Sequence, residues 1–330
     1  MKDELQRRRL LLALDGRLEL GRLTRGERKD LLDAAVQEGV HRLVAARYPE
    51  LGEPPKSWRA GVVLPGYVTR RAIALLEEAG IACAVLKGVA VAAMAWERPE
   101  LRPQWDVDLL VAPRDQTRAA EVLQKGGLAG KMKLEGRNWH HLVLYTASPP
   151  GLVIEIHREL TVDLPVNVNA DDLLARSIRI ETPDGELPTL DREDTIVYLA
   201  LHASVHAMER LQWVVDIAHF VRRQPIDWEV AVMRARTWGI ALPVEIAWRQ
   251  AVVMLSAQIP AAALRELGVP WARRVLSGTL LDGARRAGGA IRQALERAFR
   301  LSLVPTPPAL ASTLRRKLRA RAEGQRAAGS

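Results

Sequence analysis

The amino-acid sequence predicts an α+β protein in which a small sheet with flanking helices lies between helical N-terminal and C-terminal regions. Within residues 73–162, apolar runs and helical patterns alternate in the order strand, helix, strand, helix and hairpin. Before this unit and after Pro165, apolar residues recur at the spacing of helices instead. This order of elements indicates one compact α/β unit with helical regions on both sides.

The N-terminal region is expected to be helical up to about residue 48. Its helical spacing is carried by Leu10, Leu14, Leu31, Leu32, Val36, Val40 and Leu43. Residues 49–65 include Pro54-Pro55 and are predicted to form a loop or linker. A helix over 68–79 follows, and Gly80 is expected to end it, because glycine readily adopts the left-handed conformation found after helices.

The α/β unit is predicted from short apolar runs that are separated by turn residues. Its expected elements are, in order, a strand at 81–86, a helix at 89–96, a strand at 106–111, a helix at 115–125, a glycine-rich turn at 126–136, and strands at 140–146 and 152–157. The last two strands are joined across Pro149-Pro150-Gly151 and therefore read as a hairpin.

Beyond Pro165 only helices are expected. Asp191 starts a helix that reaches residue 208, and a second helix covers 211–221. Asp227 caps a helix over 228–238, and Pro243 opens another that ends near residue 255. The predicted divisions are a helical region at 1–72, a catalytic core at 73–165, a helical domain at 166–303, and a proline-containing linker with a basic tail at 304–330.

Composition narrows the functional classes. The 330 residues carry a net charge of +9 and a pI of about 10.1, which suits phosphate-bearing or acidic partners. The basic tail has no aromatic residue, so a nucleic-acid partner is not favoured. Cys83 is the single cysteine, which excludes an intrachain disulfide and a cysteine-based zinc site. The N-terminal apolar run is too short and too charged to be a signal peptide or membrane span, so a cytoplasmic location is expected.

Asp106 and Asp108 are the most informative residues. Side chains alternate along a strand, so both carboxylates project from one face, while Val107, Leu109 and Val111 project from the other. Two neighbouring acids repel each other unless a cation lies between them, so a divalent-metal site at the end of a core strand is expected. The alternative is a solvated turn at the strand end.

Glu155 is a third candidate ligand. It shares a strand face with His157, while Ile154 and Ile156 project from the other face. Burying a carboxylate in such an apolar strand is unfavourable unless the carboxylate is paired or holds a metal. On a strand next to Asp106 and Asp108 it would complete a three-carboxylate site suited to two Mg²⁺ ions. The alternative is a pair with Arg158 or exposure to solvent.

Lys87-Gly88 lies where a strand turns into a helix, a place where backbone N–H groups attract anions. Gly88 allows close approach of a ligand to the backbone, and Lys87 supplies a point charge for a phosphate. Arg102 can contact a phosphate, neutralise the carboxylates, or form a structural salt bridge. His140, His141 and His157 likewise either lie at the mouth of the site or form structural hydrogen bonds.

The histidines His202 and His206 lie four residues apart on one predicted helix face. This spacing can bind zinc, but no third ligand accompanies it, so core or interface roles are favoured. Trp213 and the other tryptophans of the C-terminal half are interpreted as helix-packing residues.

Taken together, these segments resemble a bacterial nucleotidyltransferase family of the DNA polymerase β-like, kanamycin-nucleotidyltransferase-type superfamily, many of whose members are uncharacterised. The resemblance covers about residues 70–225. It is carried by Leu86-Lys87-Gly88, Arg102 with Asp106-Val107-Asp108-Leu109-Leu110-Val111, His140-His141-Leu142, Ile154-Glu155-Ile156-His157, Leu201-His202, His206, and Leu211, Trp213 and Asp216.

The resemblance implies a mixed, palm-like sheet and two Mg²⁺ ions held by Asp106, Asp108 and Glu155. It further implies binding of ATP or another nucleoside triphosphate near Lys87 and Gly88, with Arg102 and His157 also contacting the nucleotide. The expected reaction is transfer of a nucleoside monophosphate to a small molecule, peptide or protein, with release of pyrophosphate. The acceptor, the nucleotide and the oligomeric state are not readable from the sequence.

Two other functions stay open at this stage. A D-x-D at a strand end also binds the metal and nucleotide sugar of a glycosyltransferase, although that class does not use Glu155 or Lys87-Gly88 in this way. A catalytically retired nucleotide-binding module is the non-enzymatic alternative, against which stands the presence of all three acids.

Overall fold

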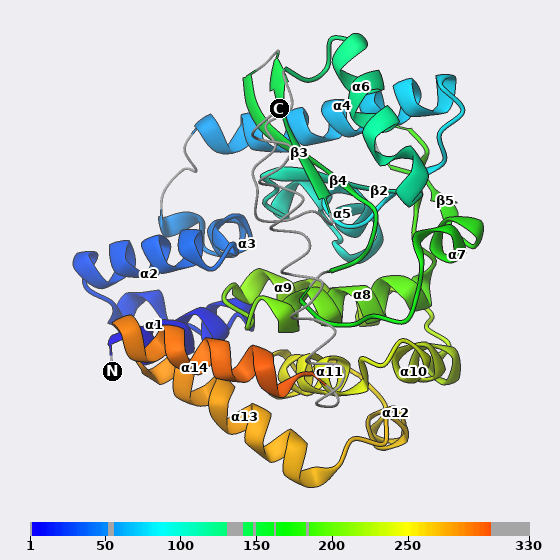
Figure 1. The fold of residues 1–330 in the computed structure, drawn as a ribbon. Coiled ribbons are helices and arrows are strands. Elements are labelled where there is room, and N and C mark those ends of the chain that lie inside the picture. Colours follow the sequence, from blue (N-terminus) through cyan, green and yellow to red (C-terminus); the bar gives the residue numbers. More distant parts are fainter. Residues whose placement is uncertain are drawn as a thin grey trace.

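The computed structural model describes residues 2–51, 56–130, 141–147, 150–161, 163–182 and 185–304. It confirms the predicted α+β class, because the described residues form a six-stranded mixed sheet flanked by helices (Figure 1). The strands are β1 (Cys83–Val85), β2 (Asp106–Val111), β3 (His141–Ala147), β4 (Pro150–His157), β5 (Ile178–Ile180) and β6 (Leu187–Thr189). Their order across the sheet is β3-β4-β2-β1-β6-β5.

The centre of the sheet is β2. It pairs in parallel with β4 and antiparallel with β1, while β3 pairs antiparallel with β4 to form the predicted hairpin. β1 pairs in parallel with β6, which pairs antiparallel with β5. The strand directions are therefore mixed, as the family resemblance implied.

Helices make up the rest of the described chain. They are α1 (Lys2–Leu14), α2 (Arg25–Gln37), α3 (His41–Arg47), α4 (Lys56–Glu78), α5 (Val89–Ala95), α6 (Gln116–Lys125), α7 (Ala170–Ala175), α8 (Arg192–Val205), α9 (Leu211–Arg223), α10 (Trp228–Thr237), α11 (Ala241–Leu255), α12 (Ala261–Glu266), α13 (Trp271–Arg286) and α14 (Gly289–Ser302). Short 3-10 turns are η1 (Leu20–Arg22), η2 (Pro49–Leu51), η3 (Pro99–Leu101) and η4 (Pro113–Asp115).

The sheet lies between two helical layers. In Figure 1, α4 and α6 lie above it, whereas α8 and α9 lie below it, with α11, α13 and α14 beyond them. Val107, Leu109 and Val111 join the buried apolar cluster that includes α4 and α6. Leu110 points the other way and joins the cluster formed by α8 and α9. The face of β2 that carries Asp106 and Asp108 is therefore turned toward the C-terminal helices.

Two sequence predictions about this architecture are wrong. Residues 49–65 were expected to be a loop, but α4 already begins at Lys56 and continues through Pro65. A proline in a helix interior removes one backbone hydrogen bond, which a helix of 23 residues tolerates. Only helices were expected after Pro165, but β5 and β6 extend the sheet there. Each has three residues, too few to show an alternating pattern.

The predicted helix starts at Asp191 and Asp227 are confirmed. The Asp191 carboxylate accepts a hydrogen bond from the backbone N–H of Asp194 at 2.7 Å, and Asp227 caps α10 in the same way. The predicted domain divisions stay a prediction. Residues 305–330, which include nearly all of the predicted linker and tail, lie outside the described chain, as do His140 and residues 131–136 of the glycine-rich turn.

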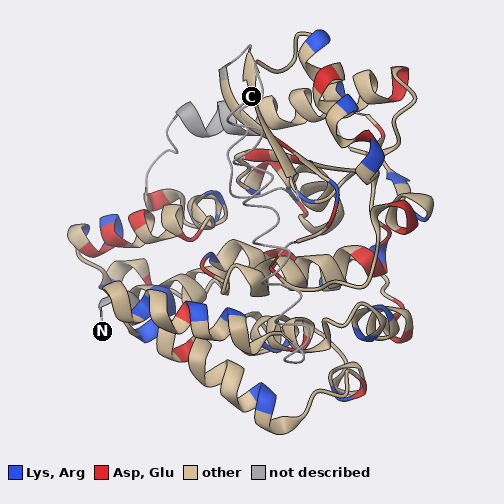
Figure 2. Cartoon of the chain, in the orientation of Figure 1, with Lys and Arg blue, Asp and Glu red and all other residues tan. Residues whose placement is uncertain are grey.

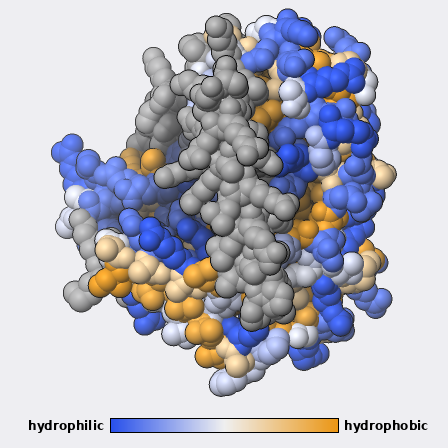
Figure 3. All heavy atoms as spheres, in the orientation of Figure 1, coloured by the Kyte–Doolittle hydropathy of each residue, from blue (hydrophilic) through white to orange (hydrophobic). Residues whose placement is uncertain are grey.

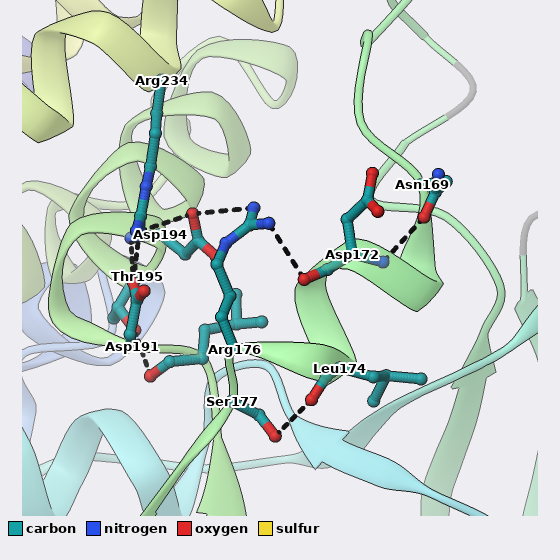
Figure 4. Close-up of polar contacts among 10 residues, drawn as sticks. Asn169, Asp172, Leu174, Arg176, Ser177, Asp191, Asp194, Thr195 and Arg234 are labelled. Carbon is teal, nitrogen blue, oxygen red and sulfur yellow. Dashed lines mark hydrogen bonds and ion pairs between the residues drawn. The ribbon is translucent and has the colours of Figure 1, made fainter.

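A partly buried ion network centred on Asp194 fixes α8 against its neighbours (Figure 4). Asp194, at the start of α8, accepts a hydrogen bond from Arg176 at 2.6 Å and another from Arg234 at 2.9 Å. Arg176 follows α7 and Arg234 lies on α10, so one carboxylate joins three elements. The helix that faces the acidic side of the sheet is thus held at its N-terminal end.

The outer surface carries charges of both signs, interspersed over the helices in the view of Figure 2. Apolar side chains also reach the surface over α13 and α14 (Figure 3), where Trp271 and Ile291 are largely exposed. Among the described helices, none combines the length and apolarity that crossing a membrane requires.

Candidate functional site

Three carboxylates come together at the centre of the sheet. Asp106 and Asp108 share one face of β2, and β4 runs beside it in a register that pairs Asp108 with Glu155. Paired residues on neighbouring strands have closely spaced side chains, so Glu155 lies next to Asp108. The structure thus brings the three predicted ligands onto adjoining strands. Asp108 is fully buried, whereas Asp106 and Glu155 are partly exposed.

Lys87 lies against the two aspartates. It follows β1, and its Nζ atom is 3.5 Å from Asp106 Oδ2 and 3.3 Å from Asp108 Oδ1. The backbone N–H of Leu86 donates to the carbonyl of Asp108 at 3.1 Å, which holds the two segments together. In this structure the lysine therefore compensates the two aspartates, for which a neighbouring cation was predicted.

His157 is the second cation of the cluster. Its Nε2 atom is 3.1 Å from Asp108 Oδ1 and 3.3 Å from Glu155 Oε2. Burial acts to lower the pKa of this histidine, but hydrogen bonds to Asp108 and Glu155 outweigh that effect and raise it to about 9. His157 is thus protonated at neutral pH, and with Lys87 it offsets part of the negative charge.

The carboxylates respond differently to this environment. Neighbouring Asp108 raises the pKa of Asp106, because two like charges lie close together. Burial acts to raise the pKa of Asp108 as well, but Lys87 and His157 dominate and lower it to about 2. Asp108 is therefore held as a buried anion.

The Oδ2 atom of Asp108 supports a cation site. Among the described residues, this buried oxygen has no hydrogen-bond partner. A buried carboxylate oxygen without a partner is energetically costly unless a ligand satisfies it. The donor set of three carboxylates on adjoining strands also matches the oxygen ligands that Mg²⁺ prefers. The residues present consequently fit a divalent cation.

Gly88 occupies a backbone conformation that favours glycine, with φ of 60° and ψ of −122°. We expect Gly88→Ala to reduce the free energy of unfolding by about 1–3 kcal/mol, because non-glycine residues are strained in this region. Urea unfolding followed by circular dichroism measures the change. Gly278→Ala in α13 is the matched control, since nothing lies near its added methyl group and helical alanine is favoured over glycine. Equal effects of the two substitutions would contradict the assignment of strain.

Arg102 forms a structural salt bridge, which was one of the three roles considered for it. Its Nε and Nη2 atoms donate to the two oxygens of Asp216 at 2.9 and 2.8 Å, and the indole of Trp96 donates to the same carboxylate at 2.8 Å. Arg102 also donates weakly to the carbonyl of Gly88, at 3.4 Å. The pair with Asp216 joins the segment before β2 to α9. Contact between Arg102 and a phosphate stays a prediction, and this pairing disfavours it.

Helices α8 and α9 form a wall that faces the carboxylates, and this wall was not predicted from the sequence. A cavity of about 370 Å³ is lined on one side by Lys87, Asp106, Glu155 and the histidines His141 and His157. Its other side is lined by Tyr198, His202, His206 and Trp213. Tyr198 and His202 lie on α8 and His206 is the residue that caps its C-terminal end, so the four-residue spacing places all three on one face, which is turned to the cavity. His202 and Trp213 meet edge to face, with ring centroids 5.0 Å apart.

Comparison with known proteins gives one family match. A model described as uncharacterised nucleotidyltransferase matches residues 67–256, more than half of the chain. No curated protein sequence matches.

Two solved structures are similar. One is an antigenic nucleotidyltransferase-like protein from Paracoccidioides brasiliensis, with 12% identity and a TM-score of 0.40 over 61% of this chain and 92% of that chain. The other is the antibiotic-resistance factor ANT(2'')-Ia, with 11% identity and a TM-score of 0.34 over 59% of this chain and 96% of that chain.

Proposed function

The chain belongs to the uncharacterised nucleotidyltransferase family, and on that premise we propose that it transfers a nucleoside monophosphate from a nucleoside triphosphate to a hydroxyl-bearing acceptor. The acceptor hydroxyl gives up its proton to solvent and its oxygen attacks the α-phosphorus, the bond from that phosphorus to the bridging oxygen breaks, and pyrophosphate leaves with the electron pair. The acceptor is a small molecule, a peptide or a protein.

The observation that carries the proposal is the meeting of three carboxylates, one of which, Asp108, has a buried oxygen without a hydrogen-bond partner among the described residues. Asp106, Asp108 and Glu155 would hold one or two Mg²⁺ ions. Bound Mg²⁺ supplies charge neutralisation at the phosphates and lowers the pKa of an acceptor hydroxyl. The protein holds the carboxylates on the strands of a packed sheet, which fixes their positions before any ligand arrives.

Lys87 is the residue we assign to the triphosphate. It is positively charged, lines the cavity and already contacts the carboxylates. When a cation takes over compensation of Asp106 and Asp108, the lysine ammonium is available to a phosphate oxygen. Its flexible stem allows this change of partner without movement of the sheet.

The ring-lined wall of the cavity suits the nucleobase. Burial holds the pKa of His202 well below its ordinary value, so this ring is uncharged at neutral pH. An uncharged ring next to Trp213 presents flat apolar surface on which a base can stack. Base stacking on aromatic side chains contributes about 1–3 kcal/mol.

We therefore expect Trp213→Ala to raise the dissociation constant for Mg²⁺-ATP by about 10–100-fold. Its effect on inorganic tripolyphosphate, which has no base, should be small. Isothermal titration calorimetry measures both. Trp271→Ala replaces an exposed tryptophan on α13 and serves as the control. Equal weakening of ATP and tripolyphosphate by Trp213→Ala would show that the wall does not hold the base.

The function is tested by incubating the protein with Mg²⁺, each labelled nucleoside triphosphate and a panel of acceptors. Pyrophosphate and a nucleotidylated product are the expected result. Product from a nucleotide sugar but from no triphosphate would indicate a glycosyltransferase instead. Nucleotide binding without any product over the whole panel would favour a retired binding module.

A further inference from the structure

A group of imidazole and carboxylate ligands lies beside the aspartate pair. One ligand atom from each of His141, Glu155 and His157 lies within 4.8 Å of the others. His141 and His157 are directly paired across β3 and β4, and Glu155 precedes His157 on the same face. Side chains from paired strands are held in position by the sheet, so this group is a fixed feature of the fold.

The spacing of these atoms suits a small metal ion. His157 Nε2 lies 3.3 Å from Glu155 Oε2 and 3.1 Å from Asp108 Oδ1, and His141 Nδ1 lies 3.7 Å from Glu155 Oε2. Metal–ligand bonds of about 2.0–2.1 Å in a tetrahedron separate neighbouring ligand atoms by about 3.3–3.4 Å. The observed separations lie on both sides of that value, and all three ligand atoms lie within 4.8 Å of one another. A bound ion would replace the proton that His157 shares with the two carboxylates, because a coordinating imidazole must be neutral.

The donor types differ from those that Mg²⁺ prefers. Mg²⁺ takes oxygen ligands and retains several waters, whereas imidazole nitrogen is a preferred ligand of Zn²⁺ and related transition metals. The side chains of His141 and His157 are only 8% and 6% exposed. Two buried imidazoles next to a carboxylate form a mixed nitrogen and oxygen donor set, which is typical of zinc sites.

We propose that His141, Glu155 and His157, with Asp108 at their edge, form a site for Zn²⁺ or a transition-metal ion of the same class. This inference shares Glu155 with the proposed function, but it does not require nucleotidyl transfer. If both hold, a transition metal and not Mg²⁺ occupies the Glu155 side of the cluster, and Asp106 with Asp108 holds the Mg²⁺ that accompanies the nucleotide.

Titration of metal-free protein with Co²⁺ tests the site, because tetrahedral Co²⁺ gives visible absorption bands and needs neither nucleotide nor acceptor. We expect one Co²⁺ to bind, Zn²⁺ to displace it, and a large excess of Mg²⁺ to leave it in place. His141→Ala and His157→Ala should each raise the Co²⁺ dissociation constant by at least about 100-fold. Glu155→Gln, which preserves side-chain size, should also weaken binding, and circular dichroism checks that each variant is folded.

His206→Ala is the matched control. His202 and His206 have the spacing of a histidine pair on a helix and line the same cavity, yet they are not part of this group. Co²⁺ binding should be unchanged in His206→Ala. The inference is overturned if the wild-type protein binds no Co²⁺, if Mg²⁺ displaces Co²⁺ as readily as Zn²⁺ does, or if binding survives both His141→Ala and His157→Ala. Absence of nucleotidylated product would affect only the proposed function.

Discussion

Replacing Asp108 by asparagine is expected to lower nucleotidyl transfer by at least about 1000-fold. Asp108 is the buried carboxylate that Lys87 and His157 both contact, and its environment keeps it ionised. Asparagine preserves its shape but removes the charge that would hold a cation at the α-phosphate. Charge stabilisation by a bound metal is worth several kcal/mol in the transition state, and about 4 kcal/mol corresponds to a factor of about 1000.

The measurement is the initial rate of pyrophosphate release at saturating Mg²⁺ and nucleotide, once an acceptor is found. Until then, Mg²⁺-dependent nucleotide binding by calorimetry replaces it. Asp33→Asn on α2 is the control, since this aspartate is exposed and pairs with Lys29 away from the cavity. An Asp108→Asn protein that is folded and retains a rate within about tenfold of wild type would exclude Asp108 from the metal site.

The position of Asp108 shows which features of the site can be predicted from the local sequence pattern. The alternation in residues 106–111 was sufficient to place Asp106 and Asp108 on one face and three apolar residues on the other, because side chains alternate along every strand. Glu155 and His157 followed from the same rule on β4. The register that pairs Asp108 with Glu155 is a tertiary property, and no local pattern encodes it. Only the family resemblance suggested that the two strands are neighbours.

The features that were not predicted from the sequence are those that depend on contacts between distant parts of the chain. The spacing of His202 and His206 was recognised as one helix face, but whether that face meets the core or a cavity depends on where α8 packs. Strands β5 and β6 are stabilised by pairing with each other and with β1, and not by an apolar pattern of their own. Arg102 was equally compatible with a phosphate and with a salt bridge, until the fold placed Asp216 beside it.

The Arg102–Asp216 pair gives the largest expected effect on stability. Both side chains are almost completely buried, and Asp216 also accepts a hydrogen bond from the indole of Trp96. Asp216→Asn preserves the shape of the side chain but leaves the guanidinium of Arg102 buried without a counter-charge. Breaking a buried ion pair in this way costs about 3–5 kcal/mol. We expect a loss of this size in the free energy of unfolding, measured by urea denaturation.

A double-mutant cycle separates the pair from its surroundings. Arg102→Met alone should also be strongly destabilising, because among the described side chains it leaves the Asp216 carboxylate only the indole donor of Trp96. Combining it with Asp216→Asn removes both charges, so the double variant should be more stable than the sum of the single effects predicts. Asp171→Asn, which breaks the exposed pair with Arg114, should change stability by less than about 1 kcal/mol. Additive single effects would mean that Arg102 and Asp216 stabilise the fold independently, and the pair would then not be what joins α9 to the segment that carries the acidic strand.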